Sequence, residues 1–182
     1  MFACKISETV ELQILGERYS REFFELVQKN YDRLLHWCPW MDQVDSVEKT
    51  KDFIRSKLTK FASGDGFTAG FFEKGNLIGV IALEYIDRAN RTTEIGYWLD
   101  ADAQGRGLVT AACRVLIDHA FTDLLLERIQ IRCASENIRS RAIPEKLGFS
   151  QEGVIRRCER LHDRTVDLVI YGLLETEWRS KD

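Results

Sequence analysis

Apolar and polar residues alternate, or recur at helical spacing, along most of the chain, and these two periods predict its elements. The alternating segment "TVELQIL" predicts a strand over Thr9–Leu15. Helical spacing predicts one long helix over Arg18–Trp37 and a second helix that runs to about Ala62. Asp45 and Glu48 have the spacing of a reciprocal cap at the start of the second helix.

The rest of the chain alternates between strands and helices. Further strands are predicted over Phe67–Glu73, Asn76–Ile86, Thr92–Leu99, Arg128–Ala134, Gly153–Leu161 and Thr165–Leu174. Two further helices are predicted over Gly107–Thr122 and Asn137–Leu147. The order β-α-α-β-β-β-α-β-α-β-β predicts a mixed sheet of about seven strands with about four helices on its faces, an α/β or α+β fold.

Length and composition are those of an ordinary globular domain. The 182 residues suggest a single domain over residues 1–182, and 45% apolar and 30% charged residues fit that class. The formal net charge of −3 argues against a dedicated nucleic-acid binder, which is usually basic. No apolar run reaches the ~18 residues of a membrane span, and the N-terminus has no signal-peptide pattern, so neither is expected.

The cysteines and histidines are scattered along the chain. The five cysteines form no CxxC pair, which favours a reduced, cytoplasmic compartment. The three histidines belong to no HExxH motif and to no Cys/His cluster, so we expect no metal site.

The segment "DADAQGRGLVTAACRVL" has two glycines at the start of a predicted helix. Unpaired N–H groups and the positive end of the helix dipole at such a place bind phosphate groups. Gly105 and Gly107 remove the side chains that would keep a ligand from the backbone, and they permit positive φ angles. A plain strand-to-helix turn would also use them. The segment has no P-loop motif, and the dinucleotide pattern GxGxxG fails because Thr110 occupies its third glycine position.

The wider segment "EIGYWLDADAQGRGLVTAACRVLIDHAF" resembles the acetyl-CoA-binding segment of the GNAT acetyltransferases. The Q/R-x-x-G-x-G/A signature of that family falls on Gln104, Gly105, Arg106, Gly107, Leu108 and Val109. Val109 is larger than the usual small residue at the last position. The resemblance is strongest for the RimJ/RimL branch, which acetylates N-terminal amines of proteins, notably ribosomal ones. Its other motifs follow in matching order: "IGYWLD" at Ile95–Asp100, N-x-x-S at Asn137 and Ser140, and LGF-x-x-EG at Leu147–Gly153.

The resemblance implies a splayed sheet whose two central parallel strands, here Thr92–Leu99 and Arg128–Ala134, separate around the pantetheine arm of acetyl-CoA. Asn137 matches a position that contacts this cosubstrate, although asparagine at a helix start is also a common N-cap. The cofactor-binding residues that the resemblance implies are Trp98, Leu99, Gln104, Gly105, Arg106, Gly107, Leu108, Val109, Thr110 and Asn137. Main-chain groups near Trp98 and Leu99 would pair with the arm, and the loop amides would surround the pyrophosphate.

Acetyl transfer to an amine needs a neutral amine, a stabilised oxyanion and a protonated thiolate leaving group. An α-amine with a pKa near ~8 meets the first need more easily than a lysine near ~10.4. By resemblance, Glu159 is the first candidate for a base that acts through water, and Glu94 is its rival. Ser140 matches a serine that protonates the thiolate. Each has a structural alternative: a surface ion pair for the carboxylates, and a local backbone hydrogen bond for the serine.

Four other residues are secondary candidates. Tyr97 and Tyr171 would donate a proton, unless they are core tyrosines with one satisfied hydroxyl. Arg139 and Arg141 would reach the phosphates of coenzyme A, unless they belong to a solvated helix face. The cysteines are not expected to act as nucleophiles, because transfer in this family normally proceeds without an acyl-enzyme.

The sequence leaves the acceptor open. The first choice is a protein N-terminal α-amine of the ribosomal-protein type, and Trp37 and Trp40 would close over such a peptide unless they are core residues. A small amine such as a polyamine, an amino acid or an antibiotic is the alternative within the enzyme class. A non-catalytic acyl-CoA-binding module is the alternative outside it. The resemblance also implies a homodimer.

Overall fold

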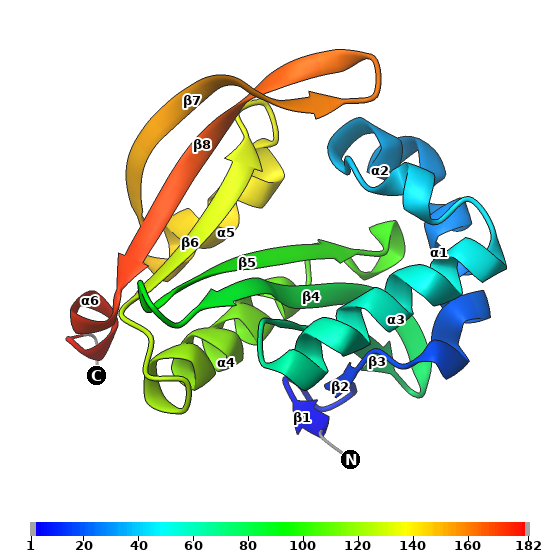
Figure 1. Cartoon of the computed structure of the whole chain (residues 1–182), viewed down its shortest axis with the longest axis horizontal. Helices are drawn as coiled ribbons and strands as arrows, with labels where there is room; N and C mark the ends of the chain where they lie inside the picture. Colours follow the sequence, from blue (N-terminus) through cyan, green and yellow to red (C-terminus); the bar gives the residue numbers. More distant parts are fainter. Residues whose placement is uncertain (1–2, 181–182) are drawn as a thin grey trace.

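The computed structural model describes residues 3–180, apart from the side chain of Asp42. Within them lie eight strands and six α-helices (Figure 1). The strands are β1 (Ala3–Lys5), β2 (Val10–Ile14), β3 (Phe67–Glu73), β4 (Asn76–Asp87), β5 (Thr92–Leu99), β6 (Arg128–Ala134), β7 (Ser150–Leu161) and β8 (Arg164–Leu174). The helices are α1 (Ser20–Lys29), α2 (Tyr31–Trp37), α3 (Val47–Ser63), α4 (Leu108–Thr122), α5 (Ile138–Leu147) and α6 (Glu175–Arg179).

All described strands form one sheet in the order β1-β2-β3-β4-β5-β6-β8-β7. The central neighbours β5 and β6 run parallel and are joined by a crossover through α4, as parallel strands require. The other pairs are antiparallel. β5 and β6 pair only over three residues, from Thr92 with Arg128 to Glu94 with Gln130. Beyond this point they diverge, and β6 continues beside β8 as the second arm of a V (Figure 1).

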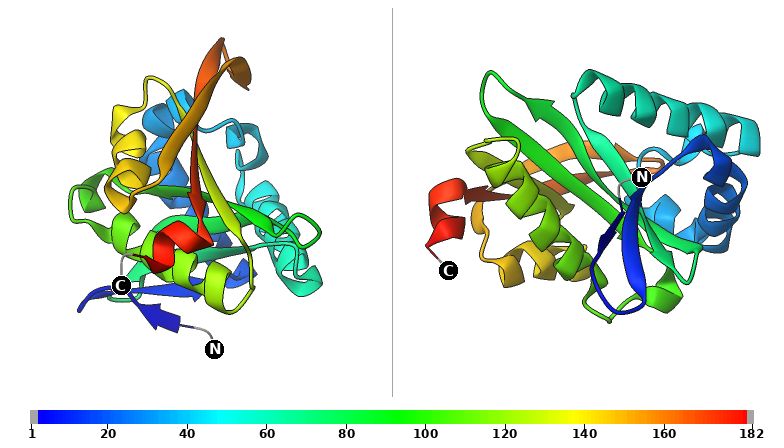
Figure 2. Two further views of the ribbon diagram at one scale, coloured as in Figure 1. Left: turned by 90° about the vertical axis from the view of Figure 1, so that its left-hand side faces the viewer. Right: turned by 90° about the horizontal axis from the view of Figure 1, so that it is seen from below.

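Helices cover both faces of the sheet (Figure 2). α4 packs on one face in the larger apolar cluster, and α1, α2 and α3 contribute a second cluster on the other face. Neighbouring residues of a strand alternate between the two apolar clusters. Phe71 and Leu99 belong to the first cluster, and Phe72 and Trp98 belong to the second. The central strands are therefore apolar on both sides, which explains their nearly continuous apolar sequences. No helix among residues 3–180 is long and apolar enough to cross a bilayer.

The mixed α/β fold and the separation of the two central strands are confirmed. β3, β5 and β6 have the predicted bounds. The structure has slightly more elements than the predicted totals of about seven strands and about four helices, because the short strand β1 and the short helix α6 carry no periodic pattern of their own. The third difference is a helix that divides in two.

The prediction of one helix over residues 18–37 is wrong, because the chain leaves helical geometry at Asn30 with φ −107° and ψ 16°.

The cap of α3 also differs from the prediction. Ser46 is the N-cap, and its Oγ accepts from the Lys49 N–H at 3.2 Å. Asp45 instead binds the Lys49 ammonium group at 2.5 Å. A hydroxyl at the N-cap position satisfies the free amide directly, so it replaces the predicted reciprocal cap.

Asn30 connects the helix break to the segment that follows β5. Its amide nitrogen donates to the Leu26 carbonyl at 2.9 Å and to Asp100 Oδ1 at 3.0 Å, while its oxygen accepts from the Ala101 N–H at 3.0 Å. Lys29 also binds Asp100, at 2.6 Å. Asn30 and Asp100 are 4% and 5% exposed, so water cannot replace these bonds.

Replacing Asn30 with Ala is expected to lower the free energy of unfolding by about 2–3 kcal/mol, because Asp100 and the Ala101 amide lose buried partners. Urea denaturation measures the change. Asn76 is an exposed asparagine at the start of β4, and Asn76→Ala is expected to change stability by less than ~0.5 kcal/mol. Equal losses in the two variants would show that the buried hydrogen bonds of Asn30 contribute nothing.

Candidate functional site

The gap between β5 and β6 exposes main-chain groups of β5. In an antiparallel pair, alternate residues direct their main-chain groups toward the partner strand. The Asp100 N–H donates to the Ile78 carbonyl of β4 at 2.7 Å. By alternation the main-chain groups of Trp98 also face β4, whereas those of Tyr97 and Leu99 face the gap. Trp98 is therefore placed to contact a ligand through its side chain, and its neighbours through their amides.

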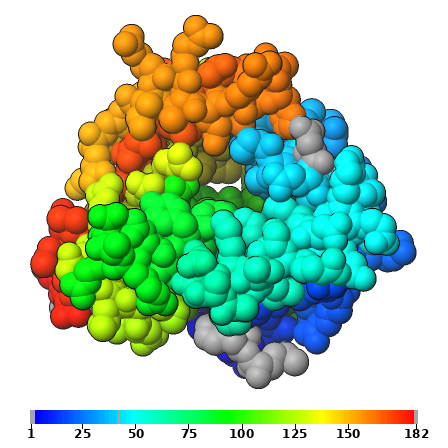
Figure 3. Space-filling view, viewed as in Figure 1, coloured from blue at the N-terminus to red at the C-terminus, as the bar shows by residue number. Residues whose placement is uncertain are grey.

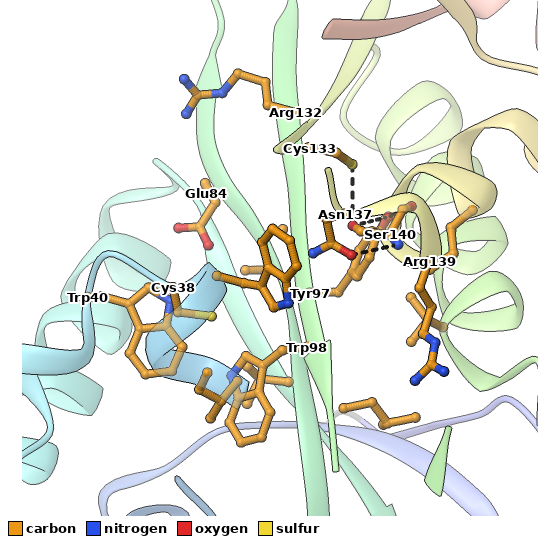
Figure 4. A pocket seen from close by; sticks show the side chains of 18 of the residues that line it. Cys38, Trp40, Glu84, Tyr97, Trp98, Arg132, Cys133, Asn137, Arg139 and Ser140 are labelled. Atoms are coloured by element: carbon orange, nitrogen blue, oxygen red, sulfur yellow. Dashed lines mark hydrogen bonds between the residues drawn. The ribbon is translucent and has the colours of Figure 1, made fainter. Parts of the chain in front are cut away.

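A cavity of about 1050 Å³ follows this gap and opens at the surface between the β7–β8 hairpin and helices α2 and α3 (Figure 3). Its walls bring together segments far apart in sequence, as Figure 4 shows for α2, β5, β6 and α5. The cavity is lined by the three leading candidates for catalysis and by all the cofactor-binding residues that the resemblance implies: Glu94, Trp98, Leu99, Gln104, Gly105, Arg106, Gly107, Leu108, Val109, Thr110, Asn137, Ser140 and Glu159.

The glycine loop has the geometry that its sequence predicts. Gly105 and Gly107 have φ angles of 77° and 75°, which other residues adopt only with strain. A Cβ atom added to either glycine would meet no protein atom within 4 Å, so the space beside the backbone is open. The Gly107 carbonyl accepts from the Ala111 N–H, and the earlier amides of this first turn have no intrahelical acceptor. These amides and the open space fit a phosphate group.

Polar side chains bind the end of β5, just before this loop. The Leu99 carbonyl accepts from the Arg33 guanidinium at 2.7 Å and from the Gln104 amide at 3.2 Å. The Gln104 oxygen in turn accepts from Arg139, whose side chain lies at the edge of the cavity (Figure 4). Asn137 is the N-cap of α5, and its oxygen accepts from the Ser140 N–H at 3.1 Å. Asn137 therefore fills the capping role and also lines the cavity.

Three other expectations need correction or refinement. Arg106 binds Glu73 through its guanidinium and lowers the pKa of that carboxyl to about 2, so Arg106 faces the cavity with its main chain. Arg141 and Tyr171 do not line the cavity. Arg141 donates to the Tyr171 hydroxyl at 3.0 Å, and this hydroxyl donates to Glu145 at 2.6 Å. Tyr171 is thus a core tyrosine with a satisfied hydroxyl. Arg141 is a hydrogen-bond partner of this tyrosine.

The two candidate bases lie in different surroundings. Glu94 accepts from Gln130 at 2.9 Å and pairs with Arg132 at 2.8 Å, so its charge is already compensated. Glu159 has no such direct partner among the described residues. Burial raises the pKa of Glu159 above its ordinary value; Arg132 opposes the rise and Glu94 adds to it. A carboxylate that is half-buried and free of a direct partner is the better proton acceptor.

A third carboxylate, Glu84, also lines the cavity and was not identified from the sequence. It lies where the β4–β5 pairing is irregular, and Lys57 of α3 binds it at 2.9 Å. A Cβ atom at Gly96 would come within 2.9 Å of Glu84 Oε1, so the glycine of "IGYWLD" makes room for this side chain. Among residues 3–180, no group of three or more His, Cys, Asp or Glu side chains is arranged to hold a metal ion.

Ser140 lies in a small hydrogen-bonded group beside the gap. Its Oγ is 3.3 Å from Cys133 Sγ and 3.5 Å from the Tyr97 hydroxyl, and Tyr97 donates to the Ser140 carbonyl at 3.1 Å (Figure 4). Burial raises the pKa of Cys133 to about 11 and that of Tyr97 well above its usual value. All three groups therefore carry their protons at neutral pH, so Cys133 is no nucleophile and Ser140 is placed as a donor.

If Ser140 protonates the thiolate, as the resemblance implies, replacing it with Ala is expected to lower kcat by about tenfold, because the departing thiolate loses a nearby hydroxyl donor. Tyr97→Phe is expected to lower kcat less, by about threefold, since the Tyr97 hydroxyl contacts the hydroxyl and carbonyl of Ser140 and would act through that residue. Steady-state kinetics at saturating acetyl-CoA measures both values. A larger loss for Tyr97→Phe than for Ser140→Ala would make the tyrosine the donor.

Aromatic rings form the wall of the cavity next to α1 and α3. Trp40 stacks on Phe53 with ring centroids 5.8 Å apart, and Phe23 and Trp98 complete the group. The Trp98 Nε1 atom is buried and has no hydrogen-bond partner among the described residues. Buried donors are normally paired, so this one is an unusual feature of the apolar cluster beside the cavity.

Known proteins share this architecture. A family model for the acetyltransferase (GNAT) domain matches residues 17–150. The chain is 36% identical over 182 residues, 100% of both chains, to "Putative ribosomal N-acetyltransferase YdaF" of Bacillus subtilis (strain 168). It is 32% identical over 168 residues to the ribosomal-protein-serine acetyltransferase of Escherichia coli (strain K12), covering 92% of this chain and 94% of the relative. A structure of RimL, a ribosomal alpha-N-protein acetyltransferase in complex with coenzyme A, matches with a TM-score of 0.91 and 26% identity, over 95% of this chain and 98% of that one.

Proposed function

The chain belongs to the GNAT acetyltransferase family, of the RimJ/RimL type, and we propose that it transfers acetyl groups from acetyl-CoA directly to the N-terminal α-amine of a protein, of the ribosomal-protein type. Acetyl transfer and the use of acetyl-CoA come with membership of the family. The acceptor and the roles of single residues are the proposal.

One observation carries this proposal. A single cavity has the glycine loop at one end and the half-buried Glu159 at another part of its wall, with the opened edge of β5 between them. A volume of about 1050 Å³ is at the upper limit of small-molecule sites, so two substrates fit together. A direct transfer needs both substrates in one cavity.

In the proposed reaction the amine nitrogen forms a bond to the acetyl carbon, and the bond from that carbon to sulfur breaks. Glu159 takes the proton that the amine loses, through water. Ser140 supplies a proton to the thiolate and regains one from solvent water, and Glu159 returns its proton to solvent. The Tyr97 or Leu99 amide, which faces the gap, stabilises the oxyanion. An α-amine is partly neutral at pH 7, so one carboxylate with a raised pKa suffices as the base.

A screen of acceptors by mass spectrometry tests the proposed substrate. Peptides with the N-termini of ribosomal proteins are expected to gain one acetyl group at the α-amine, and the same peptides with a blocked N-terminus but a free lysine are expected to gain none. A small-molecule amine is the second candidate, because the aromatic wall of Trp40 and Phe53 also suits a compact cation. Acetylation only of polyamines, amino acids or antibiotics would favour that candidate.

Two features of the cellular setting belong to the same proposal. We place the reaction in the cytoplasm, and the free thiols of all five cysteines agree with a reducing compartment. We also expect a homodimer, as the resemblance to the family implies. Light scattering of the eluted protein measures its mass.

A further inference from the structure

The tip of the β7–β8 hairpin extends beyond the rest of the sheet. β8 pairs with β6 only as far as Leu168, so Arg164–Asp167 have β7 as their one neighbouring strand among those described. The pairing with β7 is itself interrupted between Ile155 and Glu159, where Arg157 has a φ of 48°. Glu159 therefore lies on a two-stranded tip beyond an irregular segment. Two strands alone are marginally stable, so a further contact must fix the position of this tip.

Arg164 makes such a contact on the far side of the cavity, beside a second one from His162 to the Cys38 carbonyl. Its Nη2 atom donates to His36 Nε2 at 2.9 Å and to the His36 carbonyl at 3.1 Å, and its Nη1 atom donates to Glu136 Oε2 at 2.9 Å. The guanidinium also lies over the Trp37 ring, 5.2 Å from its centroid. We call these four residues the clasp. It joins the hairpin tip to α2 and to the loop between β6 and α5 (Figure 1).

The chemistry of the clasp makes one of its bonds sensitive to protonation. A guanidinium has donors and no acceptor, so His36 Nε2 must accept and must therefore carry no proton. A proton on this nitrogen would remove the acceptor and would set a second positive charge against Arg164. The nearby bond from His162 Nε2 to the Cys38 carbonyl behaves differently, because the histidine is the donor there and remains one when protonated.

The charged groups around His36 do not offset this effect. Arg164 faces it from β8, and the one carboxylate of the clasp, Glu136, is already bound to Arg164. On α2 itself, Asp32 is one turn before His36 and exposed, and Arg33 is directed to the Leu99 carbonyl. His162 lies at the hairpin turn and binds the Cys38 carbonyl.

We propose that Arg164 is a positioning residue for acetyl transfer, which fastens the hairpin tip over the cavity, holds Glu159 there, and releases the tip when His36 is protonated. The inference rests on the proposed role of Glu159. It goes beyond that role because it assigns the placement of the base, and a pH response, to residues outside the reacting groups.

Hydrogen exchange and kinetics together test the role of Arg164. Arg164→Gln is expected to raise the amide exchange rates of residues 159–166 by about tenfold and the KM of the amine acceptor by a similar factor, with kcat lowered as well because Glu159 is displaced, and with the Kd of coenzyme A unchanged. Arg164→Lys keeps the charge but cannot reach several acceptors at once, so it should restore only part of both effects. Arg160, an exposed arginine on the same hairpin, provides the control variant Arg160→Gln, for which neither value should change.

The pH response is tested with His36→Gln, which keeps an acceptor oxygen but takes up no proton. As the pH is lowered from neutral, exchange of residues 159–166 in the native protein should rise about threefold beyond the intrinsic pH effect, because a proton on His36 Nε2 removes the acceptor for Arg164. In His36→Gln it should not. The ratio of native to variant acceptor KM follows the same course, and this ratio cancels the titration of the acceptor amine itself.

Three results would overturn the inference. The first is unchanged exchange and KM in Arg164→Gln, and the second is an equal change in Arg160→Gln. The third is a pH response that persists in His36→Gln. The proposed acceptor can fail separately, since the exchange measurements need no acceptor and the kinetics can use any amine that the native enzyme acetylates.

Discussion

Replacing Glu159 with Gln is expected to lower kcat by about 100- to 1000-fold while the Kd of coenzyme A stays within about twofold. The amide has nearly the same shape as the carboxylate but accepts no proton from the amine. The glycine loop lies on another part of the cavity wall, so binding of coenzyme A is unaffected. Steady-state kinetics and isothermal titration calorimetry measure the two quantities.

The pH dependence of the native enzyme should report the same group. Burial raises the pKa of Glu159, and a general base acts only when it is ionised. Thus kcat should be constant above this raised pKa and fall as the pH drops through it, in a range above that of an ordinary glutamate. The acid limb should be absent from the residual activity of Glu159→Gln. A limb that persists in the variant would belong to another group.

Two further glutamates make the test specific. Glu152 lies on the same strand but pairs with Arg128 outside the cavity, so Glu152→Gln is expected to leave kcat within about twofold of the native value. The carboxylate of Glu94 is already bound by Gln130 and Arg132. Glu94→Gln is therefore expected to lower kcat by less than about tenfold. A larger loss for Glu94→Gln than for Glu159→Gln would make Glu94 the base.

Local patterns were sufficient to predict most elements and the geometry of the glycine loop. A strand or a helix requires only a period in consecutive residues, and the loop motif is likewise contiguous, from Gln104 to Val109. The break at Asn30 escaped prediction because apolar positions continue at helical spacing across it. Its cause is a bond to Asp100, 70 residues away, which no local period can indicate.

Contacts between distant segments account for the parts of the site that sequence reasoning missed. Glu84 lies at an irregular part of the β4–β5 pairing and binds Lys57 of α3, and both contacts join segments that are apart in the sequence. The bond from Arg164 to His36 joins residues 128 positions apart. The sequence predicted Glu159 as a base only by resemblance. That it lacks a partner, while Glu94 has two, is a property of the folded sheet.

Replacing Gly107 with Val is expected to weaken the binding of coenzyme A by at least about 100-fold, because the new side chain fills the open space in which the loop amides face a ligand. The variant also strains the backbone, since Gly107 has a φ of 75°, at a cost of about 1–3 kcal/mol in stability.

Gly75 separates the two effects, because it has a φ of 86°, an equally open Cβ position, and a place in the β3–β4 turn away from the cavity. Gly75→Val should therefore lose similar stability in thermal unfolding but bind coenzyme A with native affinity in calorimetry. If Gly107→Val bound coenzyme A as tightly as Gly75→Val does, the amides at the start of α4 would not be the phosphate site. The placement of acetyl-CoA in the gap between β5 and β6 would then lose its anchor.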